Sequence, residues 1–350
     1  MSKRVFITRR IPDAGVELLR AHGADVVVGQ LDEEKGLSTA ELLDGVKTAD
    51  VLLSLLTEPV TREVLAANPR LVGVANYAVG FNNVDVVSAT ALGIPVSNTP
   101  GVLTDTTADL TWALILGVAR RIVPAHEYMV AGRYKLWGPN LFLGADVSPG
   151  GTGRRKVLGI IGYGRIGAAV SRRAIGFDMD VLAYDPHNAA AIDADAADSA
   201  RHVRSVGLDE LLRDSDFVSL HPLLTPETHH MISERELNMM KPGAYLINVA
   251  RGPVVDEAAL VRALQNHTIA GAALDVFEDE PAMKAGLAEC ENALLVPHIA
   301  SASQDTRDRM AVIAAQNAIA HLDGSRAPNA VNPEVYDSPA YSARSSASRS

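Results

Sequence analysis

The feature that most constrains the fold of this chain is a glycine-rich turn near its middle. A run of small and aliphatic residues at 157–161 leads into Gly162-x-Gly164-x-x-Gly167, and a helical pattern follows at 165–176. In such a unit the first glycine permits a tight turn, the second admits a phosphate close to the backbone, and the third lets the helix pack on the strand. The helix N-terminus adds unpaired N–H groups and a partial positive charge. The pattern predicts a parallel α/β sheet that holds a dinucleotide at Gly162, Gly164, Arg165, Ile166 and Gly167.

Two acidic residues stand at the ends of later strand patterns. Asp185 follows a strand pattern at 180–184 and lies 18 residues beyond Gly167. A carboxylate there can accept hydrogen bonds from the ribose hydroxyls of adenosine and would repel a 2′-phosphate, which favours NAD over NADP. The alternative interpretation of Asp185 is a turn residue before a proline. Asp275 closes another strand pattern on the same sheet edge, where we expect it to accept a hydrogen bond from the nicotinamide carboxamide.

The rest of the chain alternates strand and helix patterns in two blocks. The first block has strand patterns at 5–8, 25–28, 49–53, 71–75 and 94–96, with helical patterns at 13–22 and 39–47, and the second block begins at Lys156. Apolar runs separated by helices indicate parallel sheets covered on both faces. We therefore expect fold class α/β, with two doubly wound parallel-sheet domains. Longer helical patterns cover 104–121 and 305–322, and the Ser-, Ala- and Arg-rich end of the chain predicts a disordered tail.

Composition narrows the classes of function. The chain has 350 residues, a formal net charge of -10 and a pI near 5.5. Such acidity argues against a nucleic-acid-binding surface, which requires a basic patch. Cys290 is the only cysteine, which excludes an internal disulfide and indicates a reducing compartment. The N-terminus lacks the apolar core of a signal peptide, and no apolar run reaches the roughly 20 residues of a membrane span. We expect a soluble cytoplasmic protein with no membrane contact.

Three residues in the last third of the chain suit hydride-transfer chemistry. Arg251 follows a strand pattern at 244–248, Glu280 precedes a proline, and His298 follows one. Beside a nicotinamide, the cation would hold the carboxylate of a 2-oxo or 2-hydroxy acid and the imidazole would give or take the hydroxyl proton. The glutamate would orient the imidazole and favour its charged form. Each residue alone also fits an ordinary structural role, but their order behind a dinucleotide turn favours catalysis.

A pair of neighbouring histidines, His229-His230, invites a metal-site hypothesis. A structural zinc site needs about four ligands, and no third ligand is evident near the pair. We therefore expect no metal. A pocket wall that includes Leu56, Val79 and Trp137 would suit a small acid, and interface packing is the alternative role for Trp137.

The motifs together resemble those of the D-isomer-specific 2-hydroxyacid dehydrogenases, over roughly residues 45–335. They are the glycine-rich turn and the segments 221–228, 248–256, 274–281 and 297–298. Two further segments, 76–85 and 98–109, look most like those of glyoxylate and hydroxypyruvate reductases. The resemblance implies NAD(H)-dependent reduction of glyoxylate or hydroxypyruvate to the 2-hydroxy acid, with the catalytic roles of Arg251, Glu280 and His298 given above.

The resemblance also implies a domain arrangement. A flavodoxin-like substrate domain would comprise residues 1–101 and 302–335, a Rossmann cofactor domain would be inserted at 102–301, and 336–350 would form the tail. Backbone N–H groups of Val79 and Gly80 would hold the substrate carboxylate together with Arg251. A homodimer is expected, with the loop near Trp137 meeting the partner subunit. Other residues that the resemblance places at the cofactor are Thr107, Pro222, Val249, Ala250, Asp275 and Ser301.

Two kinds of alternative remain open. Another reductase of the same family, of phosphoglycerate or D-lactate type, would use the same catalytic residues. A dinucleotide-sensing scaffold, like the transcriptional corepressors that share this fold, could also retain the triplet. A peptide-docking groove in the first domain would distinguish the scaffold from the enzyme.

Overall fold

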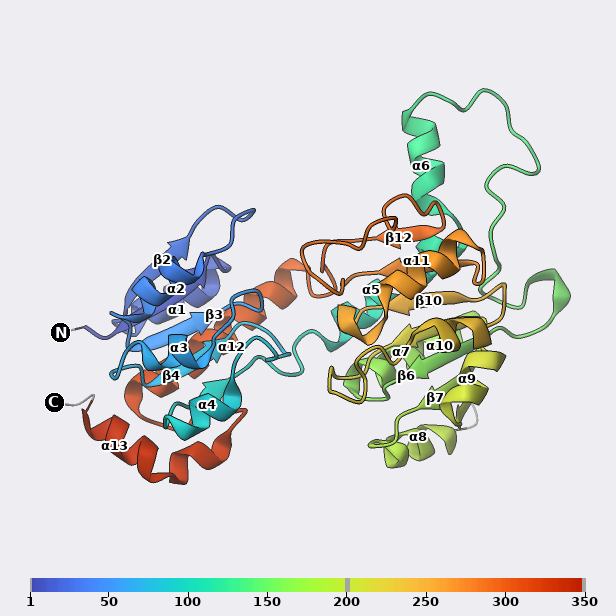
Figure 1. The fold of residues 1–350 in the computed structure, drawn as a ribbon. Coiled ribbons are helices and arrows are strands. Elements are labelled where there is room, and N and C mark those ends of the chain that lie inside the picture. Colours follow the sequence, from blue (N-terminus) through green and yellow to red (C-terminus); the bar gives the residue numbers. More distant parts are fainter. Residues whose placement is uncertain (1, 199–201, 348–350) are drawn as a thin grey trace. The chain divides into compact units, whose positions relative to one another are not determined.

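The computed structural model describes residues 2–198 and 202–347, which form two compact units (Figure 1). Unit 1 is built from both ends of the chain, up to Leu103 and again from Ala302, and unit 2 is the continuous segment Thr104–Ser301. Each unit has one central sheet whose strands pair in parallel, with helices on both faces. The predicted fold class, two doubly wound α/β domains, is confirmed. The assignment of the units to substrate and cofactor remains a proposal.

The sheet of unit 1 has five strands in the order β2-β1-β3-β4-β5. All of its strand pairs are parallel, so the carboxyl ends of the strands share one edge. Two loops that leave this edge, residues 55–58 and 77–83, matter for the site. The strands are β1 (Arg4–Arg9), β2 (Asp25–Gln30), β3 (Val51–Ser54), β4 (Gly73–Asn76) and β5 (Val96–Ser97).

Helices cover both faces of this sheet because alternate strand residues face opposite ways. Val5 and Ile7 of β1 pack in a core with α1 and α12, whereas Phe6 packs in a second core with α2, α3 and α4. The helices of unit 1 are α1 (Asp13–Ala21), α2 (Thr39–Val46), α3 (Arg62–Ala66), α4 (Val86–Ala91), α12 (Gln304–Asp323), the 3-10 helix η4 (Pro333–Asp337) and α13 (Pro339–Ala347).

The end of the chain is helical where the sequence predicts disorder. Segments η4 and α13 cover Pro333–Asp337 and Pro339–Ala347, and residues 348–350 lie outside the described residues. The guanidinium of Arg344 donates hydrogen bonds to four main-chain carbonyls, those of Asn68, Pro69 and Leu71 in the loop after α3 and that of Leu92 at the end of α4. These bonds fix α13 to unit 1, so the prediction of a disordered tail from residue 336 is wrong for 336–347.

The sheet of unit 2 has seven parallel strands in the order β12-β11-β10-β9-β6-β7-β8. The chain adds strands outward from β6 in one direction and then, from β9 on, in the other. At such a switch point the loops after the two central strands separate, and ligands bind there. The strands are β6 (Val157–Ile161), β7 (Asp180–Tyr184), β8 (Val203–Ser205), β9 (Phe217–Leu220), β10 (Tyr245–Asn248), β11 (Gly271–Leu274) and β12 (Ala293–Leu295).

Two cores sandwich this second sheet. Helices α9, α10 and α11 pack on one face, and α5, α7 and α8 pack on the other. None of the helices in the described ranges is long and apolar enough to cross a membrane. The helices of unit 2 are α5 (Thr104–Ala119), α6 (Ile122–Val130), α7 (Arg165–Ala174), α8 (Ala189–Ala196), α9 (Leu208–Asp214), α10 (Glu234–Met239) and α11 (Glu257–Gln265), with 3-10 turns η1 (Gly150–Thr152), η2 (Ile175–Phe177) and η3 (Gly252–Val254).

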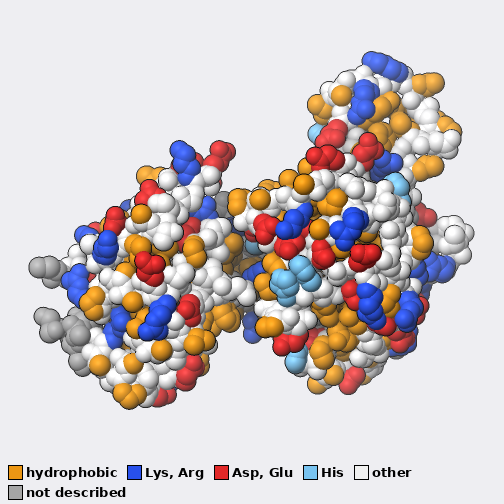
Figure 2. Space-filling view, in the orientation of Figure 1, with side chains coloured by type: hydrophobic (Ala, Val, Ile, Leu, Met, Phe, Trp, Pro, Cys, Tyr) orange, Lys and Arg blue, Asp and Glu red, His pale blue; other side chains and the backbone are white. Residues whose placement is uncertain are grey.

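A long arm, residues 122–144, leaves the body of unit 2 after α5 (Figure 1). It begins with α6, which the sequence analysis does not predict, and none of the residues of α6 is buried. Figure 2 shows hydrophobic and basic side chains side by side over the arm. Its exposed large hydrophobic residues are Ile122, Val123, Met129, Val130, Tyr134, Leu136, Trp137, Leu141 and Leu143.

Candidate active site

The glycine-rich turn lies at the switch point of the seven-stranded sheet. Gly162 follows β6 with a φ of 89°, in the left-handed region that favours glycine. A Cβ at Gly162 would lie 2.6 Å from the carbonyl carbon of His221, in the loop after β9. A Cβ at Gly167 would lie 2.2 Å from the carbonyl oxygen of Gly162. Both positions therefore require glycine for close backbone packing.

The turn fits the pyrophosphate of a dinucleotide. Gly164 is the N-cap of α7, and beyond its two chain neighbours no heavy atom of the described residues lies within 4 Å of the place where its Cβ would stand. The N–H groups of Arg165, Ile166 and Gly167 donate to no acceptor within the described chain. Open space in front of unpaired N–H groups at a helix N-terminus is the arrangement that binds phosphate.

Asp185 braces this turn at the end of β7. Its carboxylate accepts hydrogen bonds from the main-chain N–H groups of Tyr163 (2.8 Å), His187 (2.9 Å) and Asn188 (3.1 Å), and from the Asn188 side-chain amide (2.8 Å). Although burial opposes it, these bonds hold the pKa of the Asp185 carboxyl below its ordinary value. The structure thus gives Asp185 the turn-forming role of the alternative interpretation, and its contact with ribose hydroxyls stays a prediction.

Arg251 is presented by a turn that Asn248 organises. Asn248 ends β10 and is 1% exposed; its side chain accepts the N–H of Ala250 (3.0 Å) and donates to the carbonyl of Arg251 (3.0 Å). The Arg251 guanidinium donates to the Ala250 carbonyl (2.7 Å) and forms no ion pair within the described ranges. Burial lowers the pKa of Arg251, but a guanidinium stays charged in proteins. The cation is therefore available to an anionic ligand.

Glu280 and His298 form the predicted acid–base pair. Nδ1 of His298 lies 3.1 Å from Oε2 of Glu280, and Oε1 of Glu280 accepts the N–H of Phe277 (2.9 Å). Although burial opposes it, the hydrogen bond with His298 and the neighbouring charges hold the pKa of the Glu280 carboxyl below its ordinary value. Nε2 of His298 makes no hydrogen bond within the chain as described. Because the two side chains are 29% and 30% exposed, this nitrogen can exchange a proton with a ligand.

Asp275 holds the turn that carries His298. Residue 298 has a φ of 52°, and its N–H donates to the carbonyl of Asp275 (2.9 Å). The fully buried Asp275 carboxylate accepts the N–H groups of Ile299 (2.6 Å) and Ala300 (3.0 Å), and burial raises the pKa of this carboxyl. These bonds offset a left-handed backbone that costs on the order of 1 kcal/mol. The sequence analysis missed this positioning role, and the contact of Asp275 with the carboxamide stays a prediction.

Carboxylates also tie the turn of Arg251 to the turn of Glu280. The N–H of Glu278 donates to Glu257 (2.5 Å), and the N–H of Glu257 donates to Glu278 (3.3 Å). Nε2 of His230 lies 2.9 Å from the Glu278 carboxylate. Gly252 approaches Phe277 so closely that a Cβ would lie 1.8 Å from the Phe277 carbonyl oxygen. The two turns therefore form one rigid group.

His230 thus has a structural partner in Glu278. Within the part of the chain that the structure describes, no group of three or more His, Cys, Asp or Glu side chains could hold a metal ion. Sequence reasoning did not find the Glu257–Glu278 brace, because its two halves lie in different motifs.

Thr107 and Ser301 lie at the turn of His298. Thr107 on α5 is 2% exposed and its hydroxyl donates to the carbonyl of Ala300 (3.4 Å). Ser301 is the next residue along the chain and is 9% exposed. Both predicted cofactor residues are thus close to the acid–base pair, and their contacts with a cofactor stay predictions.

Pro222, Val249 and Ala250 lie on the loops after β9 and β10. The nitrogen of Pro222 would be 2.6 Å from a Cβ at Gly162, which places this proline against the glycine-rich turn. Val249 and Ala250 are 7% and 8% exposed and connect β10 to Arg251. Unit 2 therefore brings the predicted cofactor residues together around one sheet edge, and their contacts with a cofactor stay predictions as well.

The residues predicted for the substrate belong to other loops. Val79 and Gly80 are half-buried in the loop after β4 of unit 1, and their N–H groups donate to no acceptor among the described residues. Leu56 is half-buried in the loop after β3, and Trp137 is 71% exposed on the arm of unit 2. Their joint action with Arg251 on one substrate stays a prediction.

Known proteins are similar to this chain in sequence. Residues 112–300 match the family model described as D-isomer specific 2-hydroxyacid dehydrogenase, NAD binding domain. A glyoxylate reductase of Korarchaeum cryptofilum is 48% identical over 340 residues, which cover 96% of this chain and 97% of the relative. The chain belongs to the D-isomer specific 2-hydroxyacid dehydrogenases.

Solved structures agree with this family membership. The TT0316 protein of Thermus thermophilus is 40% identical and superposes with a TM-score of 0.83, over 94% of this chain and 99% of that one. An NADPH-dependent glyoxylate/hydroxypyruvate reductase of Sinorhizobium meliloti, solved with NADP and malonate, is 30% identical with a TM-score of 0.76, over 95% and 98% of the two chains. This dehydrogenase is therefore an oxidoreductase that acts on CH–OH donors, and its Rossmann domain takes a nicotinamide cofactor.

Proposed function

We propose that this dehydrogenase reduces glyoxylate or hydroxypyruvate to the corresponding 2-hydroxy acid, with NADH as the reductant. The observation that carries the proposal is the 3.1 Å contact between Glu280 and His298, in the rigid group of turns that also presents the unpaired Arg251. The relative from Korarchaeum cryptofilum, named glyoxylate reductase, supports the substrate class.

The residues divide the work of this reaction as follows. The bound nicotinamide supplies a hydride to the carbonyl carbon of the substrate. Arg251 binds the substrate carboxylate and polarises the carbonyl oxygen. His298, charged and held by Glu280, donates the proton on Nε2 to that oxygen as negative charge develops on it. The neutral imidazole then regains a proton from water at its exposed edge, and the 2-hydroxy acid leaves.

We further propose that NADH is preferred over NADPH. Asp185 keeps its negative charge at neutral pH and stands beside the glycine-rich turn, where it would repel a 2′-phosphate. Its oxygens already accept four hydrogen bonds from the protein, so charge repulsion, rather than binding of the ribose, supports the preference.

The initial rate of NADH oxidation with glyoxylate tests this proposal, repeated with hydroxypyruvate and with NADPH. We expect turnover with NADH that is at least tenfold faster than with NADPH. Faster turnover with NADPH would refute the role of Asp185 and leave the chemistry intact. If the enzyme reduces neither glyoxylate nor hydroxypyruvate with NADH or NADPH, the proposed substrate class is refuted.

A homodimer through the arm is part of the same proposal. The exposed apolar residues of the arm support it, because large apolar patches on a protein surface mark association sites. The occupant of this surface is taken to be a second copy of the chain, as the family resemblance implies. A cytoplasmic location remains the prediction of the sequence.

A further inference from the structure

Two asparagines form a reciprocal amide pair at the carboxyl edge of the sheet in unit 1. Asn76 is the last residue of β4 and is fully buried, and Asn83 stands at the far end of the following loop. Each side-chain amide donates to the other's oxygen at 3.3 Å. The hydroxyl of Ser54, at the end of β3, donates to the same Asn76 oxygen (2.9 Å). The pair therefore closes the loop 77–83 on itself.

Side-chain amides also hold the peptide groups of this loop, one from the pair and one from Asn98. Nδ2 of Asn76 donates to the carbonyl of Gly80 (2.9 Å), and Nδ2 of Asn98 donates to the carbonyl of Val79 (2.7 Å). The N–H groups of Val79 and Gly80 have no acceptor in the described parts of the chain. Successive backbone N–H groups that are held in this way form a site for an anion.

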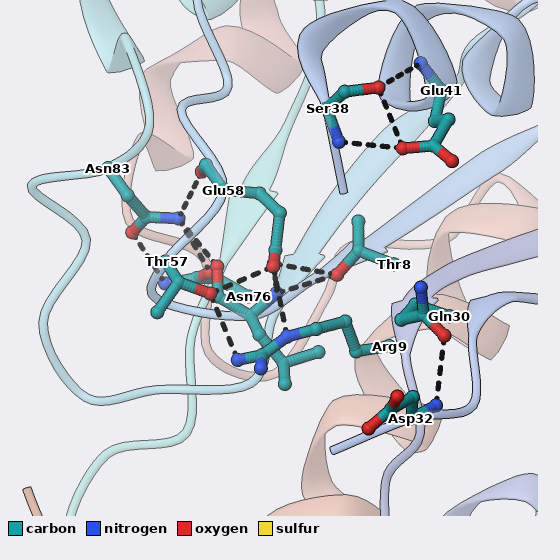
Figure 3. Close-up of polar contacts among 11 residues, drawn as sticks. Thr8, Arg9, Gln30, Asp32, Ser38, Glu41, Thr57, Glu58, Asn76 and Asn83 are labelled. Atoms are coloured by element: carbon teal, nitrogen blue, oxygen red, sulfur yellow. Dashed lines mark hydrogen bonds and ion pairs between the residues drawn. The ribbon is translucent and has the colours of Figure 1, made fainter. Parts of the chain in front are cut away.

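Asn83 extends this constraint to the neighbouring loop, 55–58. Its amide donates to the carbonyls of Leu55 (2.9 Å) and Glu58 (3.2 Å). Glu58 is 3% exposed, and its carboxylate accepts the Thr8 hydroxyl (2.8 Å) and pairs with Nε of Arg9 (3.1 Å). Figure 3 shows these side chains converging from the ends of β1 and β4 and from the two loops. Hydrogen bonds and an ion pair therefore connect the loops 55–58 and 77–83 to each other and to the end of β1.

We propose that the Asn76–Asn83 pair is a positioning device for recognition of the substrate carboxylate. It holds the loop at the carbonyl of Gly80, next to the N–H groups of Val79 and Gly80, and it bonds the neighbouring loop that carries Leu56. The peptide groups of those two N–H groups are held at their own carbonyls, by the N–H of Thr99 and the amide of Asn98. Asn76 and Asn83 are positioning residues, because they act through the backbone and not by touching the substrate. This inference rests on the proposed function, and on the role that the family resemblance implies for these N–H groups, which is to hold the carboxylate of the 2-oxo acid together with Arg251.

The test compares Asn83→Ala with Asn82→Ala in the full-length enzyme. Asn82 is the adjacent asparagine, is exposed, and makes no side-chain hydrogen bond within the described residues, so its variant is a matched control. At saturating NADH, Asn83→Ala should raise the KM for glyoxylate by about tenfold or more, since bonds to a charged ligand are weakened. Its kcat should stay within about twofold, because the acid–base pair is untouched, and Asn82→Ala should change neither constant.

The remaining outcomes of this experiment also support or overturn the role of the Asn76–Asn83 pair. An unchanged KM in Asn83→Ala, or a fall in kcat alone, would overturn the inference. If Asn83→Ala fails to fold, the isosteric Asn76→Asp, which loses the bond to the Gly80 carbonyl, takes its place in the same comparison. If the wild type reduces hydroxypyruvate but not glyoxylate, the KM for hydroxypyruvate is compared instead. If it reduces neither acid, the proposed function fails, and hydrogen exchange of segment 77–83 decides alone. Faster exchange in Asn83→Ala than in Asn82→Ala supports the pair, and equal exchange overturns it.

Discussion

Glu280 serves two turns at once, since one carboxylate oxygen accepts the Phe277 N–H and the other faces Nδ1 of His298. Its pKa is held below the ordinary value, so the carboxylate is charged across the neutral range. In the proposed reaction this charge would stabilise the imidazolium that donates the proton. Replacement of this one side chain therefore affects both the orientation and the charge of the acid.

Glu280→Gln should lower kcat by roughly 10- to 100-fold, less than the roughly 10²- to 10⁴-fold of a full general acid–base contribution, because His298 itself remains. Since the neutral amide no longer stabilises the imidazolium, the alkaline fall of the kcat profile should move to lower pH. Steady-state rates from pH 5 to 9 measure both effects. Asp279→Asn, which changes the adjacent and more exposed carboxylate, is the control, and an identical profile for both variants would contradict the role of Glu280.

His321 of α12 gives unit 1 a predictable pH dependence of stability. The imidazole is 3% exposed, faces the Ser97 hydroxyl at 3.0 Å, and burial lowers its pKa from 6.5 to about 4. The unfolded chain takes up a proton near pH 6.5 and the folded chain does not. Stability from this group is therefore complete above about pH 6.5 and is lost as the pH falls toward 4, at about 1.4 kcal/mol per pH unit.

Urea unfolding of wild type and His321→Gln between pH 5 and 7.5 tests this expectation. The variant should lose the acid-side slope that His321 contributes, whereas His229→Gln, at an exposed histidine, should keep it. Parallel pH profiles for wild type and His321→Gln would show that the buried imidazole is not the cause.

Sequence reasoning indicated which residues lie together in the candidate site more readily than it indicated what their side chains contact. Arg251, Glu280 and His298 could be selected because cation, carboxylate and imidazole follow strands in an order that suits the chemistry. Asp185 and Asp275 were interpreted as ligand contacts, yet both accept main-chain N–H groups of their own turns. A polar residue at the end of a buried strand can contact a ligand or accept main-chain N–H groups of its own turn. The backbone path of the next few residues decides which of the two it does.

At the scale of elements, α13 shows how one side chain can dock a helix of weak apolar character. The guanidinium of Arg344 donates hydrogen bonds to main-chain carbonyls in the segment 68–71, which follows α3, and at the end of α4, with distances of 2.8 Å to Leu71 and 2.9 Å to Leu92. Burial lowers the pKa of Arg344, and the carbonyl dipoles stabilise its charge.

Arg344→Ala should destabilise unit 1 by roughly 1–3 kcal/mol, because buried carbonyls lose charged hydrogen-bond donors. A lower melting temperature and faster proteolysis near residue 338 are the expected results. Arg309→Ala removes an exposed arginine of α12 that bonds only within its own helix, and it should leave both measurements unchanged. Equal melting temperatures for the two variants would contradict the docking role.

The long elements could be predicted from periodicity, and two of the helices that were missed, α6 and α13, show why periodicity has a limit. The pattern at 305–322 became α12, and the pattern at 165–176 became α7 with its 3-10 extension. Helix α6 contains Pro124 in its first turn, where proline is tolerated. Because proline usually indicates the end of a helix, the sequence pattern did not predict one here. Helix α13 has a Ser-rich composition typical of disorder, and the contacts of Arg344 that stabilise it join residues about 250 positions apart in sequence.

At the scale of the whole molecule, the arm is the feature whose large apolar side chains unit 2 leaves exposed. Val130, Leu136 and Trp137 are 74%, 82% and 71% exposed. Exposed residues of this size are costly in water and stabilising in a subunit interface. The parallel sheets of both units followed from the alternating patterns, whereas the direction and exposure of the arm could not be read from an irregular sequence.

Leu136→Asp should shift the protein from dimer to monomer in sedimentation velocity, because the charge would be buried in the interface. Val87→Asp is the matched control, since Val87 is also 82% exposed but lies on α4 of unit 1. A wild type that sediments as a monomer, or a dimer that both variants preserve, would contradict an interface through the arm.

The most direct test of the account is the rate of glyoxylate reduction by His298→Ala, measured beside the affinity of the same variant for NADH by fluorescence titration. The account predicts a kcat lower by about 10²- to 10⁴-fold, because the proton donor is gone. The dissociation constant for NADH should be unchanged, because the glycine-rich turn is intact. A kcat close to that of the wild type would contradict the assignment of His298 as the acid and, with it, the proposed chemistry of the site.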